Sequence, residues 1–174
     1  MNNNLSSKTN FLVFTGPSNV GKTLSIQNTC QFLLGRGFNA IPNEQSNQRE
    51  NEGYGLPTNP ANDFYVLLKD QRDQLVLFYS WGDNFNEIQW LHGYIQELQV
   101  RNLIPNLIVM ANRDGSEWMY RPTRNLFQLT DQNCIELPMG RMVRGDRRQA
   151  AVNWYIPTVF RIVEEFVLPR FLDL

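Results

Sequence analysis

Residues 11–34 read FLVFTGPSNVGKTLSIQNTCQFLL. The first five form a continuous apolar run that ends at a glycine, which is typical of a buried parallel strand. Apolar residues then recur at a helical spacing, at Leu24, Ile26, Cys30, Leu33 and Leu34. Gly35 and Gly37 follow this pattern and indicate where the helix ends. The stretch therefore predicts a strand, a glycine-containing loop and a helix (residues 22–34) in direct succession.

The loop between this strand and this helix fits the pattern G-x-x-x-x-G-K-S/T. Its eight residues are Gly16, Pro17, Ser18, Asn19, Val20, Gly21, Lys22 and Thr23. Glycines let backbone N–H groups turn toward an anion, and the start of a helix adds further N–H groups and the positive end of its dipole. The lysine can reach the outer phosphates of a nucleotide, and the threonine hydroxyl can ligate Mg²⁺. We therefore expect ATP or GTP to bind here with Mg²⁺; the alternative is a glycine turn with an incidental lysine.

Through this motif the chain resembles the P-loop nucleoside triphosphatase (NTPase) superfamily, whose Walker A motif is matched by residues 16–23. The resemblance is close over the strand–loop–helix unit and looser over the rest of the chain. It implies Mg²⁺-dependent nucleotide binding and, usually, hydrolysis or transfer of the terminal phosphate. It does not assign a kinase-like or a GTPase-like subgroup.

The rest of the chain alternates between expected strands and helices. Strands are expected at residues 38–41, 64–68, 75–79, 107–110 and 134–137, and helices at residues 84–100 and 148–172. The polar turn at residues 69–74 predicts an antiparallel hairpin. This order predicts one α/β domain over residues 1–174, a three-layer sandwich with a mostly parallel central sheet and room for one antiparallel strand.

Other segments have weaker patterns. Residues 1–9 are polar and are expected to fray. Residues 42–63 form a long Asn/Gln/Glu-rich loop, of the kind that serves as a lid or a binding loop. Residues 112–132 show a mixed pattern without a clear element. Pro157 is expected to kink the last helix or to start a new one.

An acid near residues 16–23, the predicted phosphate loop, is the next requirement of such a site, since P-loop proteins usually carry one at the tip of a neighbouring strand. The strand at residues 75–79 is followed by Ser80, and the acid Asp83 comes three residues later. We expect Asp83 to be the catalytic acid near Mg²⁺, with Ser80 as an auxiliary ligand. Asp83 is also a candidate cap for the helix that follows, because Asp is a preferred N-cap residue. Asp70 and Asp73 fit less well, because the hairpin places them in a turn.

Four arginines follow Gly140, namely Arg141, Arg144, Arg147 and Arg148. Arginines neutralise the charge that develops on a transferred phosphoryl group. The segment is similar to the arginine-bearing lid of small P-loop kinases, so Arg141 and Arg144 are candidate catalytic residues. The alternatives are a solvated basic loop, or a contact with nucleic acid or an acidic protein. A net charge of −1 makes nucleic acid a disfavoured partner.

The bulk composition excludes several classes of protein. A hydrophobic fraction of 42% argues against intrinsic disorder, and no uncharged apolar stretch is long enough to span a membrane. The N-terminus lacks the apolar core of a signal peptide, and Cys30 and Cys134 are expected to be free thiols, so the expected location is the cytoplasm.

The last helix has an apolar surface that suits packing on the sheet or a homodimer contact. Asn112 or Asp114 can be proposed to contact a base, although turn chemistry explains both residues equally well.

Three functions fit these features. The first is a small kinase-like phosphotransferase, with a second small-molecule or protein substrate bound under residues 42–63. The second is an NTP-hydrolysing switch or regulatory ATPase or GTPase that acts through a protein partner. The third is a module that binds nucleotide without turnover. The sequence favours the first and leaves the base and the acceptor open.

Overall fold

The computed structural model describes residues 9–17, 20–43, 53–57, 59, 62–113, 117–140 and 147–174. The strands are β1 (Asn10–Gly16), β2 (Asn39–Ala40), β3 (Tyr65–Lys69), β4 (Leu75–Tyr79), β5 (Leu107–Arg113) and β6 (Cys134–Pro138). The helices are α1 (Lys22–Gly35), α2 (Phe85–Val100), α3 (Glu117–Phe127), α4 (Arg147–Ile162) and α5 (Leu168–Phe171), with the π-helical segment η1 (Val163–Val167) between the last two. The predicted strand–loop–helix unit is confirmed as β1 and α1.

The strands form a mixed sheet in the order β2-β3-β4-β5-β1-β6 within the described part of the chain. The pairs β4–β5, β5–β1 and β1–β6 are parallel, whereas β3 is antiparallel to both β2 and β4. The α/β class, the mostly parallel sheet and the antiparallel hairpin were therefore predicted correctly. One adjacency was not: β5 lies between β4 and β1, so β4 is not the neighbour of the strand that carries the phosphate loop.

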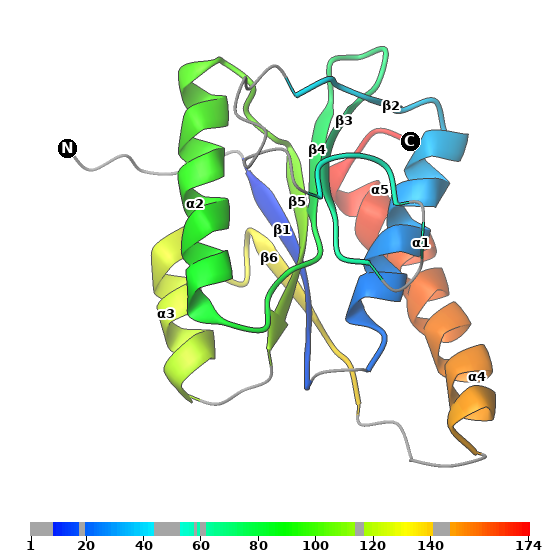
Figure 1. Cartoon of the computed structure of the whole chain (residues 1–174). Helices are drawn as coiled ribbons and strands as arrows, with labels where there is room; N and C mark the ends of the chain where they lie inside the picture. Colours follow the sequence, from blue (N-terminus) through cyan, green and yellow to red (C-terminus); the bar gives the residue numbers. More distant parts are fainter. Residues whose placement is uncertain are drawn as a thin grey trace.

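Helices cover both faces of this sheet, with α2 and α3 on one face and α1, α4 and α5 on the other (Figure 1). Alternate residues of a strand face opposite layers, as the period of a strand requires. In β1, Leu12 and Phe14 belong to the core beneath α1 and α4, whereas Phe11 and Val13 belong to the core beneath α2. Burial of each such side chain contributes about 1.5–3 kcal/mol. The two cores explain why these strands read as continuous apolar runs.

Two proline-containing segments differ from the sequence expectation. Residues 112–132 contain α3, which continues through Pro122. The last helix continues through Pro157, so no new helix starts there, and the change in helical geometry comes instead at η1. A proline removes one helical hydrogen bond. Buried neighbours offset this loss, because Thr123 and Phe127 in α3 and Ile156 in α4 are buried.

The start of α2 corrects a second expectation. Its N-cap is Asn84, not Asp83, and the Asn84 side chain accepts a hydrogen bond from the backbone N–H of Glu87. The Glu87 carboxylate in return accepts from the backbone N–H groups of Asp83 (2.9 Å) and Asn84 (3.3 Å). This capping box satisfies the first N–H groups of the helix without the Asp83 side chain. The carboxylate of Asp83 is therefore not part of the cap.

Candidate nucleotide-binding site

The phosphate loop begins where β1 ends. Gly16 has a φ of 152°, and a Cβ atom there would lie 2.6 Å from the carbonyl oxygen of Met139. Both the backbone conformation and the lack of space therefore require glycine. The loop ends at Gly21, the N-cap of α1, and no side chain of the described residues caps this helix. A helix start without a side-chain cap suits an anion. Ser18 and Asn19 lie outside the described residues.

The ammonium group of Lys22 lies across the loop. Its Nζ donates hydrogen bonds to the carbonyl oxygens of Gly16 (2.9 Å) and Pro17 (2.8 Å) and lies 3.6 Å from a carboxylate oxygen of Asp83. Burial lowers the pKa of Lys22, the negative charge of Asp83 opposes this shift, and the positive charge of Arg113 adds to it. The structure thus places a largely buried cation within the residues that fit the G-x-x-x-x-G-K-S/T pattern.

Thr23, the next residue, contacts an acid that sequence reasoning missed. Its hydroxyl donates a hydrogen bond of 2.9 Å to Oδ1 of Asp63. The hydroxyl of Ser80 donates to the same oxygen at 3.0 Å. Ser80 is 3% exposed and is itself fixed by Phe64, whose backbone N–H donates to Ser80 Oγ at 2.7 Å and whose carbonyl accepts from the Ser80 N–H at 3.0 Å. Two hydroxyls and one carboxylate therefore form a connected cluster beside the phosphate loop.

The β3–β4 hairpin explains why Asp63 lies here. Tyr65 is paired with Tyr79, so the residues before β3 meet the residues after β4. Gln27, in the second turn of α1, donates from its side chain to the carbonyl oxygens of Asn59 (3.0 Å) and Asn62 (3.4 Å). The end of the long polar loop is thereby held against α1. The observed register continues with Phe64 opposite Ser80, so Asp63 comes next to Ser80 at the open end of the hairpin.

Asp83 lies on the lysine side of the site. The connection from β4 to α2 passes directly over the end of β5, since a Cβ atom on Gly82 would lie 2.2 Å from the carbonyl oxygen of Ala111. The backbone N–H of Arg113 donates to the carbonyl oxygen of Gly82 at 2.9 Å and fixes this approach. The close passage brings the Asp83 carboxylate, 54% exposed, to Lys22. The expectation that Asp83 is the acid near Mg²⁺ stays a prediction, and the carboxylate in contact with Thr23 is that of Asp63.

Arg113 is a further cation that sequence reasoning missed. It is the last residue of β5 and is paired with Gly16 across the sheet. Its guanidinium makes a long contact of 3.5 Å with the carbonyl oxygen of Asp83. Only its place in the Asn-Arg-Asp-Gly run, at the end of a buried strand, could have drawn attention to it. Arg113 therefore lies at the carboxyl-terminal end of β5, beside the start of the phosphate loop.

The two candidate catalytic arginines, Arg141 and Arg144, lie outside the described residues. The residues just before them lie next to the end of β1, because the Met139 N–H donates to the Thr15 carbonyl at 2.6 Å and Gly140 follows. The Tyr155 hydroxyl of α4 accepts from the Gly140 N–H at 3.2 Å. Met139 and Gly140 therefore lie beside the end of β1.

Asn112, one candidate for a base contact, is buried at 2% exposure and is paired with Thr15. Its Oδ1 atom has no hydrogen-bond partner within the described residues. Asp114, the other candidate, lies outside them. The base contact stays a prediction.

The residues present fit a magnesium ion that arrives with a nucleotide. Mg²⁺ prefers oxygen ligands and is usually held by one or two protein groups together with phosphate oxygens. Thr23, Ser80 and Asp63 offer only oxygen atoms, all within one hydrogen-bonded cluster. No cluster of three or more His, Cys, Asp or Glu side chains suited to a metal occurs in the described ranges. The metal would therefore depend on phosphate oxygens as well as on this cluster.

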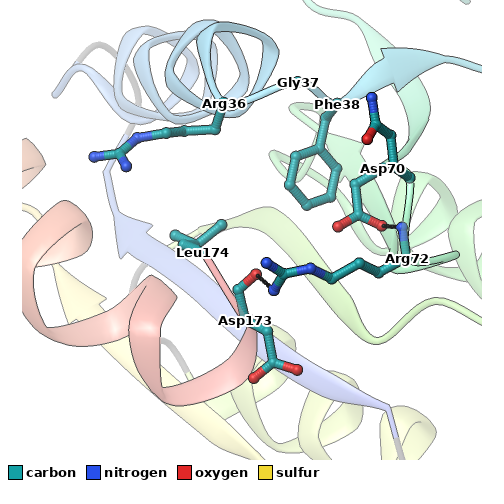
Figure 2. Close-up of a pocket in the computed structure, with 8 residues that line it drawn as sticks. Arg36, Gly37, Phe38, Asp70, Arg72, Asp173 and Leu174 are labelled. Carbon is teal, nitrogen blue, oxygen red and sulfur yellow. Dashed lines mark hydrogen bonds between the residues drawn. The ribbon is translucent and has the colours of Figure 1, made fainter.

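A cavity of about 310 Å³ lies elsewhere on the molecule (Figure 2). Its lining includes Arg36 and Phe38 after α1, Arg72 in the hairpin turn, and Asp173. The Arg72 guanidinium donates to the Asp173 carbonyl at 2.7 Å. Since α1 has 14 residues and starts at the phosphate loop, its other end lies about 20 Å away. This cavity is therefore separate from the candidate nucleotide site.

No protein-family model, curated protein sequence or solved structure matches this chain. None of the helices in the described ranges is long and apolar enough to cross a membrane. The fold and the site together define an α/β protein with a mixed, mostly parallel sheet and a glycine-containing loop between β1 and α1.

Proposed function

We propose that this chain binds a nucleoside triphosphate with Mg²⁺ on residues 16–23 and transfers its terminal phosphate to a second substrate. The observation that carries the proposal is the position of Lys22 at the start of α1. Its ammonium donates hydrogen bonds to the carbonyl oxygens of Gly16 and Pro17. Lys22 and the loop N–H groups would hold the phosphates. Thr23 would ligate the metal, and the resemblance to P-loop NTPases supports these roles.

In the proposed reaction, the acceptor oxygen forms a bond to the γ-phosphorus while the bond to the β,γ-bridging oxygen breaks, and the acceptor proton passes to an oxygen of the transferred phosphate. Bound Mg²⁺ would supply positive charge on the phosphate oxygens. Lys22 and Arg113 would neutralise the remaining charge, with Arg141 and Arg144 as additional candidates. Asp83 would keep Lys22 charged and oriented. Exclusion of water by a second substrate near residues 42–63 would favour transfer over hydrolysis.

One observation favours the alternative of an NTP-hydrolysing switch. Asp63 ends the long polar loop and accepts a hydrogen bond from Thr23, so this loop is connected to the residue that would contact the metal. A loop with that connection can report the state of the nucleotide to a protein partner. A module that binds without turnover is the third alternative. For each of the three functions we propose that the protein is cytoplasmic, in keeping with its two free cysteines, Cys30 and Cys134.

Binding and turnover are tested in sequence. Thermal unfolding is measured with ATP and with GTP, each with and without Mg²⁺, for the wild type, Lys22→Ala and the control Lys69→Ala. Lys69 is a suitable control because it pairs with Asp73 in the hairpin. A nucleotide at about 100 times its Kd should stabilise the wild type and the control by about 2.7 kcal/mol and leave Lys22→Ala unchanged. The absence of any shift in the wild type would refute the proposal.

Turnover separates the remaining functions. Phosphate release without any acceptor indicates a hydrolase, whereas phosphorylated product that forms only with an acceptor indicates a phosphotransferase. Binding without either product indicates the non-hydrolysing module.

A further inference from the structure

We infer that Asp63 positions the metal-binding hydroxyl of Thr23, so that the two acids of the site have separate tasks. Asp63 acts on the metal side and Asp83 on the lysine side. This inference rests on the proposed function, because it concerns the Mg²⁺ that accompanies the nucleotide.

The hydrogen bond from Thr23 to Asp63 carries the first step. A hydroxyl has one proton to donate and two lone pairs to offer. Thr23 donates its proton to Asp63 Oδ1 at 2.9 Å, which leaves the oxygen lone pairs for a cation. Second partners of this kind orient a metal ligand and raise its basicity. Asp63 therefore acts through Thr23 as a positioning residue.

Asp63 is itself held by two separate elements. Ser80, at the end of β4, donates to its Oδ1 at 3.0 Å, and the buried Ser80 hydroxyl is fixed in turn by the N–H of Phe64 at 2.7 Å. On the other side, Gln27 holds the segment that leads into Asp63. Thr23 and Gln27 are four residues apart and lie on one face of α1. The carboxylate is therefore fixed over the first turn of the helix, although Asp63 itself is exposed.

Asp83 belongs to the other half of the site. Its carboxylate lies 3.6 Å from the ammonium of Lys22. Removal of this charge should change how Lys22 meets phosphate, with or without a metal. Asp63 is thus predicted to affect the affinity for the metal, and Asp83 the affinity for the nucleotide without metal.

The test measures two affinities of each full-length variant. The first is the Kd for ATP in EDTA, by calorimetry. The second is the Kd for Mn²⁺ in the protein–ATP complex, from the electron paramagnetic resonance signal of free Mn²⁺. The variants are Asp63→Asn, Asp63→Glu, Asp83→Asn and Ser80→Ala, with Asp73→Asn as the matched control. Asp73 is a suitable control because it is 81% exposed in the hairpin turn, where it pairs with Lys69.

Asp63→Asn should weaken Mn²⁺ binding in the ATP complex by about tenfold or more and leave metal-free ATP binding at the wild-type level. Ser80→Ala should show the same selective loss to a smaller degree, and Asp63→Glu should restore part of it. Asp83→Asn should change metal-free ATP binding and leave the Mn²⁺ affinity unchanged. Asp73→Asn should match the wild type in both measurements.

Three results would overturn the inference. One is an Asp63→Asn variant with wild-type Mn²⁺ affinity. Another is an equal loss of metal-free and metal-dependent binding in that variant, which would make Asp63 a loop anchor only. The third is a selective loss of metal in Asp83→Asn instead. If Asp63→Asn fails to fold, Ser80→Ala decides by the same criteria. If the wild type binds no ATP with or without metal, the proposed function itself fails.

Discussion

The hydroxyl of Thr23 at the start of α1 donates a 2.9 Å hydrogen bond to the carboxylate of Asp63, which lies 40 residues later in the chain. This contact joins the two halves of the site. The loop that would hold the phosphates is formed locally by β1 and α1, whereas the acid beside the Thr23 hydroxyl, the proposed metal ligand, is brought in by the β3–β4 hairpin. The local half depends on eight consecutive residues, and the other half depends on how the hairpin packs.

Ser80→Ala tests how firmly the hairpin half is held. The substitution removes the acceptor for the Phe64 N–H, which donates at 2.7 Å in a buried position. Loss of the partner of a buried donor costs about 1–3 kcal/mol, so the free energy of unfolding in urea should fall by this amount. Thr158→Ala is the control, because the Thr158 hydroxyl bonds only to the Trp154 carbonyl of its own helix among the contacts described and is exposed. An unchanged free energy of unfolding for Ser80→Ala would contradict the geometry.

Gly82→Ala tests the passage of the β4–α2 connection over β5. The new Cβ atom would lie 2.2 Å from the Ala111 carbonyl oxygen, and a backbone atom cannot move aside cheaply. The free energy of unfolding should fall by about 1–3 kcal/mol, as is typical of overpacking, and Asp83 should move away from Lys22. Gly93→Ala is a matched control in α2, where a Cβ atom meets nothing within 4 Å. This control should gain about 0.5–1 kcal/mol, because alanine favours a helix. A neutral Gly82→Ala variant would show that the connection is not held in this close passage.

Much of the fold could be predicted because its signals are local. The apolar runs at β1, β4 and β5 are buried on both faces, and the polar turn between β3 and β4 was long enough only for a hairpin. The order of the strands has no such signal. Nothing near β5 in the sequence shows that it pairs with both β1 and β4. The choice of Asp83 as the acid near Mg²⁺ treated β4 as a neighbour of β1, whereas β5 lies between them, and its role at the metal stays a prediction.

The remaining errors have physical causes of the same kind. Residues 112–132 showed only a mixed pattern, so α3 was not predicted, and the helix continues through Pro122 with Thr123 and Phe127 buried. Asp63 was passed over because it closes a long polar stretch in which no single acid stands out. Its significance comes from Ser80 and Thr23, which the hairpin and α1 place beside it.

The C-terminal helices carry exposed apolar side chains that predict self-association. Trp154 is 70% exposed, Phe166 is 69% exposed and Ile162 is 42% exposed. Sedimentation velocity over rising protein concentration should show a dimer, and the double variant Trp154→Lys/Phe166→Lys should be a monomer because lysine in the contact would remain charged and unpaired. Val100→Lys is the control, since Val100 is 87% exposed at the end of α2. A wild type that stays monomeric at every concentration would remove this contact.

The pH dependence of nucleotide binding tests the environment of Lys22. Burial lowers the pKa of Lys22 from its ordinary value of 10.5, although Asp83 partly opposes this shift. Phosphate favours the charged form of the lysine, so a bound nucleotide raises the pKa of Lys22 above its value in the free protein. When the pH rises through the lower, free-protein pKa, binding must take up a proton and the affinity falls. The affinity for ATP, measured by calorimetry between about pH 8 and pH 10, should therefore decrease with pH by at most about tenfold per unit.

The matched variant for this measurement is Lys22→Arg. A guanidinium keeps its charge over this whole range, so the alkaline loss of affinity should disappear even if binding is weaker overall. Lys69→Ala should retain the wild-type slope, because Lys69 pairs with Asp73 in the hairpin turn rather than with the phosphate loop. If Lys22→Arg loses affinity with pH as steeply as the wild type does, another group is responsible for the slope. Lys22 would then not be the cation that meets the phosphates.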